Sequence, residues 1–499
     1  MANVLFITVD QWRGECLGAA GHPIVLTPNL DRLAAEGVLF RRHYAQAAPC
    51  GPSRASIHTG QYLMNHRSVL NGTPLDARCT NVALEVRAHG YDPVLFGYTD
   101  ASPDPRVLAG DDPRLRSYEG VLPGYRAVLD LPEHGAAWGV WLREKGYDVP
   151  ENVADFYEPV SDAPGAPTAY AAEHSEAAFL TGEVLRYLDE RDQAVDGDCW
   201  FVHAAYIRPH PPFVAPEPYA SMYDPAKMSM PVRHETFEAE GAVSPLLAGA
   251  LAIPGIRMGD DVDELLQTRA TYFGMMSEVD AQVGRLLDGI RARGEWDDTL
   301  VILTSDHGEQ LGDHWLTQKL GWFDQSYHIP LIVHDPRAAH AHGTVVDGPF
   351  TENVDLMPTI LEWLEIAIPI QCDGRSLLPL VGGSIPERWR DAAFWEWEFR
   401  DPIGGFAEAA FGLTMDQCAL CVLRDEHGKY VHFTGLPPIF YDLDRDPSEL
   451  ENRAEDPEYA PTVLRYAQRM LSLRMEHMDQ TLTGLLVTPA GLLDGRGAS

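Results

Sequence analysis

The feature that most constrains the fold is an alternation of short apolar runs with helical segments, in which the runs end in polar side chains. Residues 4–9 form a continuous apolar run that ends at Asp10. Residues 299–305 form a second run, which leads into Asp306 and His307. Such runs are typical of strands buried on both faces, as in parallel sheets, whose carboxyl ends share one ligand-binding edge. The sequence therefore predicts an α/β fold with a large, mostly parallel sheet between helices.

The elements between these two runs follow the same rhythm. Thr27 stands at the N-cap position of a helix with Pro28 in its first turn, where both residue types are favoured. Further strands are expected at 92–97 and 199–205, and further helices at 170–188 and 269–290. Alternation of this kind places helices on both faces of the sheet.

A change in composition near Asp373 marks the end of this first region. Short aromatic-rich strands are expected after it, at 393–399 and 429–433. A helix follows, because apolar residues recur at intervals of three and four at Leu464, Ala467, Leu471, Met475 and Met478. We therefore expect an α/β domain over residues 1–375, a smaller α+β subdomain over 376–480 and an extended tail over 481–499.

The charge balance limits the partners of the chain. Among 499 residues, 74 are Asp or Glu and 38 are Lys or Arg, so the net charge is −36 with neutral histidines. A surface this acidic repels phosphate backbones, and no basic stripe is present, which argues against nucleic-acid binding. A small anionic substrate would need a local cationic pocket or a metal ion to draw it in.

The compartment is also constrained by composition. No apolar run approaches the ~20 residues of a membrane helix, and the N-terminus lacks the cationic and apolar regions of a secretory signal. The seven cysteines are an odd number spread over the chain, which indicates reduced thiols rather than a disulfide framework. We expect a cytoplasmic protein without membrane association.

The most specific stretch runs from Ala48 to Gly60 and contains Cys50-Gly-Pro-Ser-Arg54 followed by Thr59-Gly60. Taken alone, Cys50 is equally compatible with a buried structural thiol or a thiolate nucleophile. The whole pattern resembles the sulfatase signature, in which the cysteine is oxidised after translation to formylglycine. The resemblance implies covalent catalysis by the aldehyde hydrate, in which one hydroxyl attacks sulfur or phosphorus and the second collapses the ester. It also implies a formylglycine-generating maturation enzyme as a partner.

The two polar strand ends predict a metal site. Asp10 with Gln11 and Asp306 with His307 place two oxygen or nitrogen ligands at each of two strand ends, where they can converge on one ion. A single acid at a strand end is also typical of a helix cap. Together with Cys50, the set resembles the metal site of sulfatases in the alkaline phosphatase superfamily. Gln11 and His307 make it less negative than a three-carboxylate cage, so Mn²⁺ is as suitable as Ca²⁺ or Mg²⁺.

The same resemblance implies roles for three further side chains. Arg54 lies four residues after Cys50, one turn along a helix, and would stabilise the aldehyde hydrate. Lys319 would contact the substrate oxygen and the leaving group, although a lone loop lysine is usually solvated. His210 lies between prolines that fix its ring, as a general acid requires, with a charge-paired structural histidine as the alternative.

Several segments look most like bacterial phosphonate monoester hydrolases and phosphodiesterases within the superfamily. These segments are Asp10-Gln-Trp-Arg13, Tyr62-Leu-Met-Asn-His-Arg67 and Gly97-Tyr-Thr-Asp-Ala-Ser-Pro103. By that likeness Asn71, Tyr98 and Thr99 would face the non-bridging oxygens or the second ester group of the substrate. Asn71-Gly72 is also an ordinary turn sequence.

One further candidate, His58, stays open, and two pairs of residues are expected to have structural roles. His58 could orient the modified residue 50 or simply pack in its helix. Asp324 and His328 have a spacing seen at one zinc of alkaline phosphatases, but they follow rather than precede Asp306-His307, so we expect a structural role. The Cys418-x-x-Cys421 pair lacks a second pair at zinc spacing and is expected in the core.

These observations predict a formylglycine-dependent hydrolase with one divalent metal ion, acting on sulfate monoesters, phosphonate monoesters or phosphodiesters. Each of these groups carries about one negative charge, so one cationic pocket suits all three. The alternatives are a two-metal phosphomonoesterase or phosphomutase, and a binding protein without catalytic activity. The apolar residues Leu482, Leu485, Leu486 and Val487 in the tail predict a dimer or tetramer in which the tail wraps a neighbouring subunit.

Overall fold

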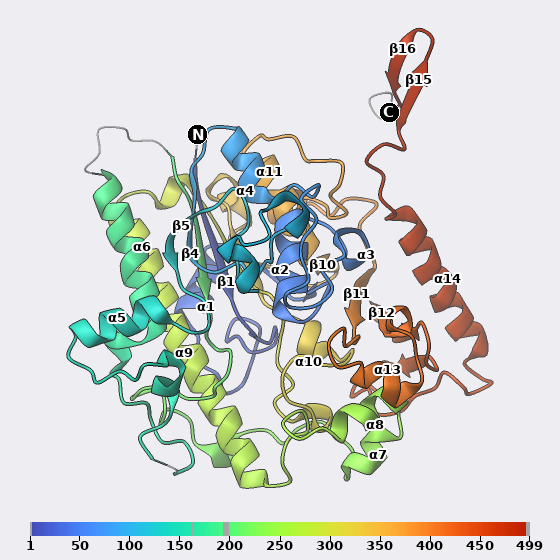
Figure 1. The fold of residues 1–499 in the computed structure, drawn as a ribbon, viewed down its shortest axis with the longest axis horizontal. Coiled ribbons are helices and arrows are strands. Elements are labelled where there is room, and N and C mark those ends of the chain that lie inside the picture. Colours follow the sequence, from blue (N-terminus) through green and yellow to red (C-terminus); the bar gives the residue numbers. More distant parts are fainter. Residues whose placement is uncertain (1, 162, 193–198, 496–499) are drawn as a thin grey trace.

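The computed structural model describes residues 2–161, 163–192 and 199–495, and an eight-stranded sheet forms its centre (Figure 1). The strands lie in the order β5 (Arg126–Asp130), β4 (Pro93–Gly97), β6 (Phe201–Tyr206), β1 (Asn3–Val9), β7 (Thr299–Ser305), β8 (Leu331–His334), β2 (Val38–Phe40) and β9 (Thr344–Val346). β8 runs antiparallel to β7 and β2, and the other neighbours pair in parallel. The predicted large, mostly parallel sheet is confirmed.

The register of β1 brings the two predicted strand ends together. Val9 pairs with Ser305 of β7 and with Tyr206 of β6. The residues that follow, Asp10 and Asp306, therefore leave the sheet side by side at its carboxyl edge. The hydrogen-bond ladder of the sheet, rather than a flexible loop, sets the distance between them.

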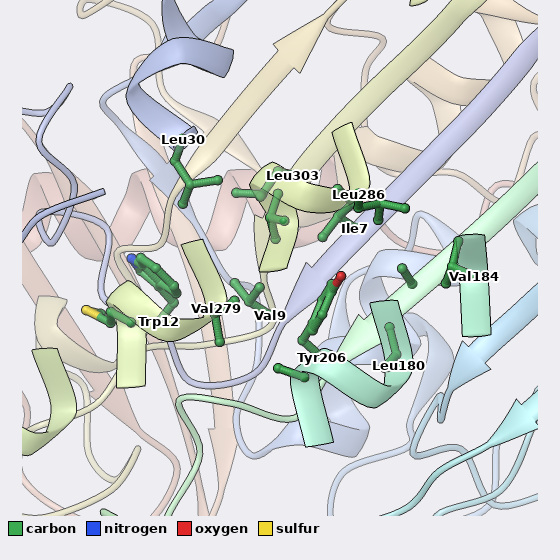
Figure 2. Packing of buried hydrophobic residues seen from close by; sticks show 14 of the residues in the cluster. Ile7, Val9, Trp12, Leu30, Leu180, Val184, Tyr206, Val279, Leu286 and Leu303 are labelled. Carbon is green, nitrogen blue, oxygen red and sulfur yellow. The ribbon is translucent and has the colours of Figure 1, made fainter. Parts of the chain in front are cut away.

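Helices cover both faces of the sheet because β1 is buried on both. Its alternate residues Leu5, Ile7 and Val9 belong to the core cluster formed with α1 (Pro28–Ala35), α6 (Glu176–Asp192) and α9 (Val262–Ala292). Figure 2 shows Ile7 and Val9 among side chains of α6 and α9. Val4 and Phe6 belong to the cluster on the other face, formed with α2 (Cys50–Thr59), α4 (Val82–Ala88) and α11 (Leu356–Trp363). Each such side chain stabilises the fold by about 1.5–3 kcal/mol.

Two predicted helices differ in detail from the observed ones. The helix expected at 170–188 begins later, at Glu176, because a separate 3₁₀ turn occupies Ala172–His174. Thr27 does precede α1, but its hydroxyl does not cap the helix. It accepts a hydrogen bond from the Gly18 N–H (2.9 Å) and donates to Asp31 (3.0 Å), so it ties the preceding loop to the first turn.

A second sheet follows the main one and is antiparallel throughout. It consists of β11 (Ala392–Glu398), β12 (Ala419–Asp425), β13 (Gly428–Phe433) and β14 (Ile439–Asp442). One face, with Trp395 and Val422, packs on aromatic residues of the main domain. The other face, with Phe394, packs on α14 (Ala460–Glu476). A smaller C-terminal α+β subdomain is therefore confirmed, whereas the boundaries at 375 and 480 stay predictions.

The shorter elements connect these layers. They are α3 (Leu63–His66), α5 (Ala136–Glu144), α7 (Phe237–Gly241), α8 (Pro245–Leu251), α10 (Asp324–Tyr327), α12 (Leu378–Val381) and α13 (Phe406–Phe411), with β3 (His43–Tyr44) and β10 (Thr351–Glu352) in a two-stranded parallel sheet. In the described ranges, no helix combines the length and apolar character that crossing a bilayer requires. All seven cysteines lie in these ranges and all are free thiols, as predicted.

The tail folds into a hairpin instead of remaining simply extended. β15 (Leu485–Thr488) and β16 (Gly491–Asp494) pair in antiparallel fashion, and the Thr488 hydroxyl donates to the Gly491 carbonyl across the turn. Figure 1 shows this hairpin projecting away from the rest of the chain, beyond the end of α14. Its apolar residues stay in solvent, with Val487 84% exposed.

Candidate active site

The site lies where α2 begins, beside the carboxyl ends of β1 and β7. α2 starts at Cys50, and every one of its residues is buried. Gly60 ends the helix in the left-handed conformation (φ 67°), which glycine adopts without strain. The predicted placement of Arg54 one turn after Cys50 is therefore observed.

Cys50 and the strand-end residues form one buried cluster. Ligand atoms of Asp10, Cys50, Asp306 and His307 all lie within 4.8 Å of one another. Cys50 Sγ is 3.1 Å from His307 Nε2. His307 Nδ1 donates to the Gly308 carbonyl (3.0 Å), so Nε2 carries the lone pair that faces the cluster.

This cluster fits a divalent cation. Asp10 Oδ1 is buried and has no hydrogen-bond partner among the described residues. Two carboxylates, an imidazole nitrogen and a sulfur surround the space next to it, and this donor set suits a metal ion. Burial raises the pKa of the Cys50 thiol well above its ordinary value, and the Asp10 carboxylate raises it further.

Arg54 connects the two strand ends from the helix side. Its Nε donates to Asp306 Oδ2 (3.0 Å) and its Nη2 donates to Asp10 Oδ2 (2.8 Å). Burial raises the pKa of the Asp10 carboxyl, but the positive charge of Arg54 and other neighbours lowers it below its usual range. The Asp10 carboxylate therefore stays ionised, and the two hydrogen bonds from Arg54 fix the direction of both carboxylates.

Gln11 turns toward a lysine and a glutamate. Its Oε1 accepts a hydrogen bond from Lys319 Nζ (2.9 Å) and its Nε2 donates to Glu309. Burial lowers the pKa of Lys319, but Asp10, Asp306 and other negative groups raise it above its usual value, so the ammonium stays charged. Glu309 was not predicted, although its position three residues after Asp306 was a usable signal.

His210 lies on the other side of Lys319. Its Nδ1 donates to the Pro211 carbonyl (2.8 Å), which directs Nε2 into the site. Nε2 lies 3.3 Å from Lys319 Nζ and 3.3 Å from Glu133 Oε1. Burial, followed by the charge of Lys319, lowers the pKa of His210 to about 3. The imidazole is therefore neutral and accepts from the lysine.

An open cavity of about 390 Å³ leads to these groups. Polar and apolar side chains line it together, and they are Pro49, Cys50, Asn71, Glu133, His210, Pro211, Gln318, Lys319, Leu320 and Trp397. Trp397 comes from β11 of the second sheet, so both parts of the chain build the wall. Trp397 and Glu133 were not predicted, because no local motif marks them.

The sulfatase family model matches residues 2–366, and the model described as N-sulphoglucosamine sulphohydrolase, C-terminal, matches residues 312–476. The chain belongs to the sulfatase family. Within the alkaline phosphatase superfamily it is an ester-bond hydrolase, as predicted from the signature around Cys50.

Three relatives show where it stands among sulfatases. The multifunctional alkaline phosphatase superfamily protein PehA of Trinickia caryophylli is 44% identical, over 98% of both chains. The crystal structure of the phosphonate monoester hydrolase of Agrobacterium radiobacter is 48% identical, covers 99% of both chains and superposes with a TM-score of 0.94. The arylsulfatase of Clostridium perfringens is 27% identical, over 96% of both chains. The chain is thus a sulfatase-family hydrolase close to phosphonate monoester hydrolases.

The three side chains expected at the substrate occupy different places. Asn71 lines the cavity, and its Oδ1 accepts from the Gly51 N–H (2.9 Å). Tyr98 lies behind the cavity, where its hydroxyl donates to Asp10 Oδ2 (2.8 Å) and the Arg54 guanidinium stacks 4.1 Å from its ring centre. The Thr99 hydroxyl donates to the Gly120 carbonyl (2.7 Å) and is fully buried. Of the three, Asn71 lines this cavity, whereas Tyr98 and Thr99 are buried with their hydroxyls hydrogen-bonded within the chain; their contacts with the substrate stay predictions.

The remaining candidates have structural environments. The His58 ring packs between Phe6 and Tyr125 in the core, so it does not support residue 50 directly. Asp324 pairs with the buried Lys429 (2.6 Å), and His328 Nε2 donates to the Arg41 carbonyl (2.7 Å). Cys418 and Cys421 lie in the two cores on opposite faces of the second sheet. The structural roles expected for both of these pairs agree with these positions.

Proposed function

We propose that this sulfatase-family hydrolase cleaves sulfate monoesters, phosphonate monoesters and phosphodiesters with a formylglycine made from Cys50 and one divalent metal ion. The observation that carries the proposal is the buried cluster in which Cys50, at the start of α2, meets Asp10, Asp306 and His307. The names of its relatives, a phosphonate monoester hydrolase and an arylsulfatase, support these substrate classes.

The metal would be held by Asp10, Asp306, His307 and the side chain at position 50, with Gln11 as a further oxygen ligand. Gln11 Oε1 now accepts from Lys319, and a carbonyl oxygen has a second lone pair for a cation. Mn²⁺, Ca²⁺ and Mg²⁺ all suit this mixed set. When bound, the ion and the hydrated aldehyde supply the Lewis acid and the nucleophile of the reaction.

The other side chains of the site position charge and move a proton. Arg54 holds the two carboxylates and the residue-50 side chain in one arrangement. Lys319 presents its ammonium to the non-bridging oxygens of the ester and to the leaving oxygen. An anionic ester next to His210 favours its protonated form, and Nε2 then gives the proton to the leaving oxygen as the ester bond breaks.

We propose that the Asn71 side chain binds the sulfate, phosphonate or phosphate group that is transferred. Its Oδ1 is occupied by the Gly51 N–H, so the amide nitrogen is left to donate to a non-bridging oxygen. We propose that Tyr98 acts indirectly, because its hydroxyl donates to Asp10 Oδ2 and so orients the carboxylate. The apolar side chains of the lining, which include Trp397 and Leu320, would contact the organic part of the ester.

The test combines the chemistry of residue 50 with the metal content. Protein made together with a maturation enzyme should carry the aldehyde in the peptide containing Cys50, and it should hold one tightly bound metal ion per chain. Cys50→Ala should lose hydrolysis of an aryl sulfate, a phosphonate monoester and a phosphodiester together. Cys16→Ala, at a buried cysteine outside the site, is the matched control and should retain activity.

Two outcomes would reject the proposal. Two tightly bound ions per chain, with activity in Cys50→Ala, would indicate a two-metal phosphomonoesterase or phosphomutase. If neither the unaltered protein nor any variant hydrolyses any of the three esters, with or without metal, the chain would be a binding protein. Unconverted cysteine alone decides nothing, since conversion depends on the host's maturation enzyme.

We further propose that the hairpin of β15 and β16 joins subunits into a dimer or tetramer. The support is the exposure of its apolar side chains, including Leu486 at 63% and Val487 at 84%. As with the cytoplasmic location, the oligomeric state is a prediction from the sequence, and the test of the hairpin is given in the Discussion.

A further inference from the structure

The most distinctive feature outside the active site is a second cavity, rich in arginine, in a chain whose net charge is −36. It measures about 640 Å³ and lies between α14 and the segment that enters β11. Its lining consists of Tyr62, Arg375, Arg388, Trp389, Arg390, Asp391, Ala392, Leu423, Arg465, Gln468, Arg469, Ser472, Leu473, Glu476 and His477. It shares no residue with the cavity that leads to Cys50.

Two of the five arginines are neutralised by carboxylates and have a structural role. Arg390 donates to Asp355 Oδ1 (2.9 Å) and pairs with Glu352 (3.2 Å), and both of these acids are buried. Arg469 pairs with Asp391 (3.0 Å) and also with Asp425. These pairs tie the second sheet to its neighbours and leave little net charge for a ligand.

The other three arginines are different. Arg375, Arg388 and Arg465 are exposed, and no carboxylate of the described residues lies within ion-pair distance of them. Arg375 Nη1 donates to the backbone carbonyl of Arg388 (2.9 Å), and the Arg465 guanidinium lies 5.6 Å from the ring centre of Tyr466. Three unpaired positive charges around one cavity repel one another, and an anion between them would relieve that repulsion.

The α14 wall of the cavity adds hydrogen-bond donors. Arg465, Arg469 and Ser472 follow each other at spacings of four and three, so they share one face of the helix. Gln468 and His477 line the cavity as well. Two acidic residues, Asp391 and Glu476, also line the cavity. The charge of Asp391 is compensated by Arg469, so Glu476 is the acid that would repel a bound anion.

We propose that this cavity binds a small molecule with a multivalent oxyanion group, such as a phosphate or diphosphate. Arginine suits such groups because its planar fork of donors matches two oxygens at once. The cavity has the size of a small-molecule site. A long polyanion is a poor alternative, because the surrounding chain carries a large negative charge.

The proposal is tested by titrating the full-length protein with pyrophosphate in a calorimeter. Arg388→Ala and Arg465→Ala should each weaken binding about tenfold, since each variant removes one charge-assisted hydrogen-bond donor. Glu476→Gln should strengthen it, because it removes the opposing charge. Arg116→Ala, which removes an exposed arginine elsewhere, should leave the affinity unchanged.

The active site also admits oxyanions, so its contribution must be measured separately. Ester hydrolysis and its competitive inhibition by pyrophosphate should be the same in Arg388→Ala, Arg465→Ala and the unaltered protein. The proposal would be overturned if all of the pyrophosphate binding were competitive with the ester. It would also be overturned if the substitutions of Arg388, Arg465 and Glu476 left the affinity for pyrophosphate unchanged. A fall in the mass seen by light scattering in Arg465→Ala would overturn it too, because acidic side chains of a second copy would then be the occupant.

Discussion

Nζ of Lys319 lies 3.3 Å from Nε2 of His210, and each side chain is held from its other side. The Pro211 carbonyl accepts from His210 Nδ1, and Gln11 Oε1 accepts from Lys319. The neutral imidazole and the charged ammonium therefore face the cavity together, and in the proposed reaction the first carries a proton and the second supplies a fixed positive charge. Substitutions of His210 and of Lys319 should therefore affect hydrolysis in different ways.

His210→Gln should slow hydrolysis most for esters with poor leaving groups. A leaving oxygen of low basicity departs without a proton, whereas a basic one needs the acid. We expect a loss of about 10²–10⁴-fold for alkyl esters and a much smaller loss for nitrophenyl esters. The check is a plot of rate against leaving-group pKa for both proteins. Parallel lines would assign His210 a structural role. Lys319→Met should slow the hydrolysis of every ester, because the ammonium also faces the non-bridging oxygens that all of them share.

Removal of the metal should abolish activity and lower stability. Without a cation, Asp10 Oδ1 is a buried oxygen with no partner in the described residues, and such groups are costly. Dialysis against a chelator should reduce the rate about a thousandfold, since a bound ion contributes several kcal/mol to the transition state. Re-addition of Mn²⁺ or Ca²⁺ should restore both the rate and the melting temperature. Full activity after complete chelation would contradict the metal site.

Arg54→Met should destabilise the protein, and most strongly when no metal is bound. The arginine is buried against Asp10 and Asp306, and loss of one partner of a buried ion pair costs about 3–5 kcal/mol. Denaturation with and without metal measures the effect. Arg78→Ala removes an ion pair with Asp76 at an exposed arginine and should leave the free energy of unfolding nearly unchanged, because solvent screens such pairs.

His58 should make stability depend on acid pH. Burial between Phe6 and Tyr125 lowers its pKa to about 3, whereas an unfolded histidine titrates near 6.5. The unfolded state therefore binds more protons between these values, so this stability is complete above about pH 6.5 and is lost as the pH falls toward 3. In that pH range, the unfolding free energy of the unaltered protein should fall with decreasing pH more steeply than that of His58→Leu. The difference between the two slopes should be up to about 1.4 kcal/mol per pH unit.

Truncation after Gln480 should reduce the mass of the particle in solution. The removed hairpin buries little of its own apolar surface, and Leu492 and Leu493 are 63% and 55% exposed. Light scattering on the full chain and on the truncated chain gives the comparison. Replacing both leucines by serine is the finer variant, since it keeps the length of the hairpin. An unchanged mass in both variants would contradict the subunit contact.

The parts of the molecule that could be predicted from sequence are those set by local pattern. Continuous apolar runs indicated β1 and β7, and the residues after them indicated the cluster of Asp10, Asp306 and His307. β5 and α5 were not predicted, because the stretch around them is rich in proline, glycine and acids and shows no clean period.

The rest of the site depends on long-range packing. Trp397 reaches the cavity only because the second sheet packs on the aromatic core that includes Trp322 and Phe323. Likewise Thr99 follows Tyr98 in the chain, but its hydroxyl is taken by backbone groups of residues 120 and 122. Motif positions identified which residues gather in the buried cluster around Cys50, and tertiary contacts decided which side chains line the cavity beside it.

The contribution of Trp397 has a consequence for how such an enzyme can diversify. The charged groups around Cys50 come from the main sheet and its loops, while Trp397 in the cavity wall belongs to the second sheet. If the proposed function holds, substitution of Trp397 should change which organic groups the cavity accepts and leave the cluster of Asp10, Cys50, Asp306 and His307 in place. Substrate range and reaction chemistry would then be able to change independently in proteins with this architecture.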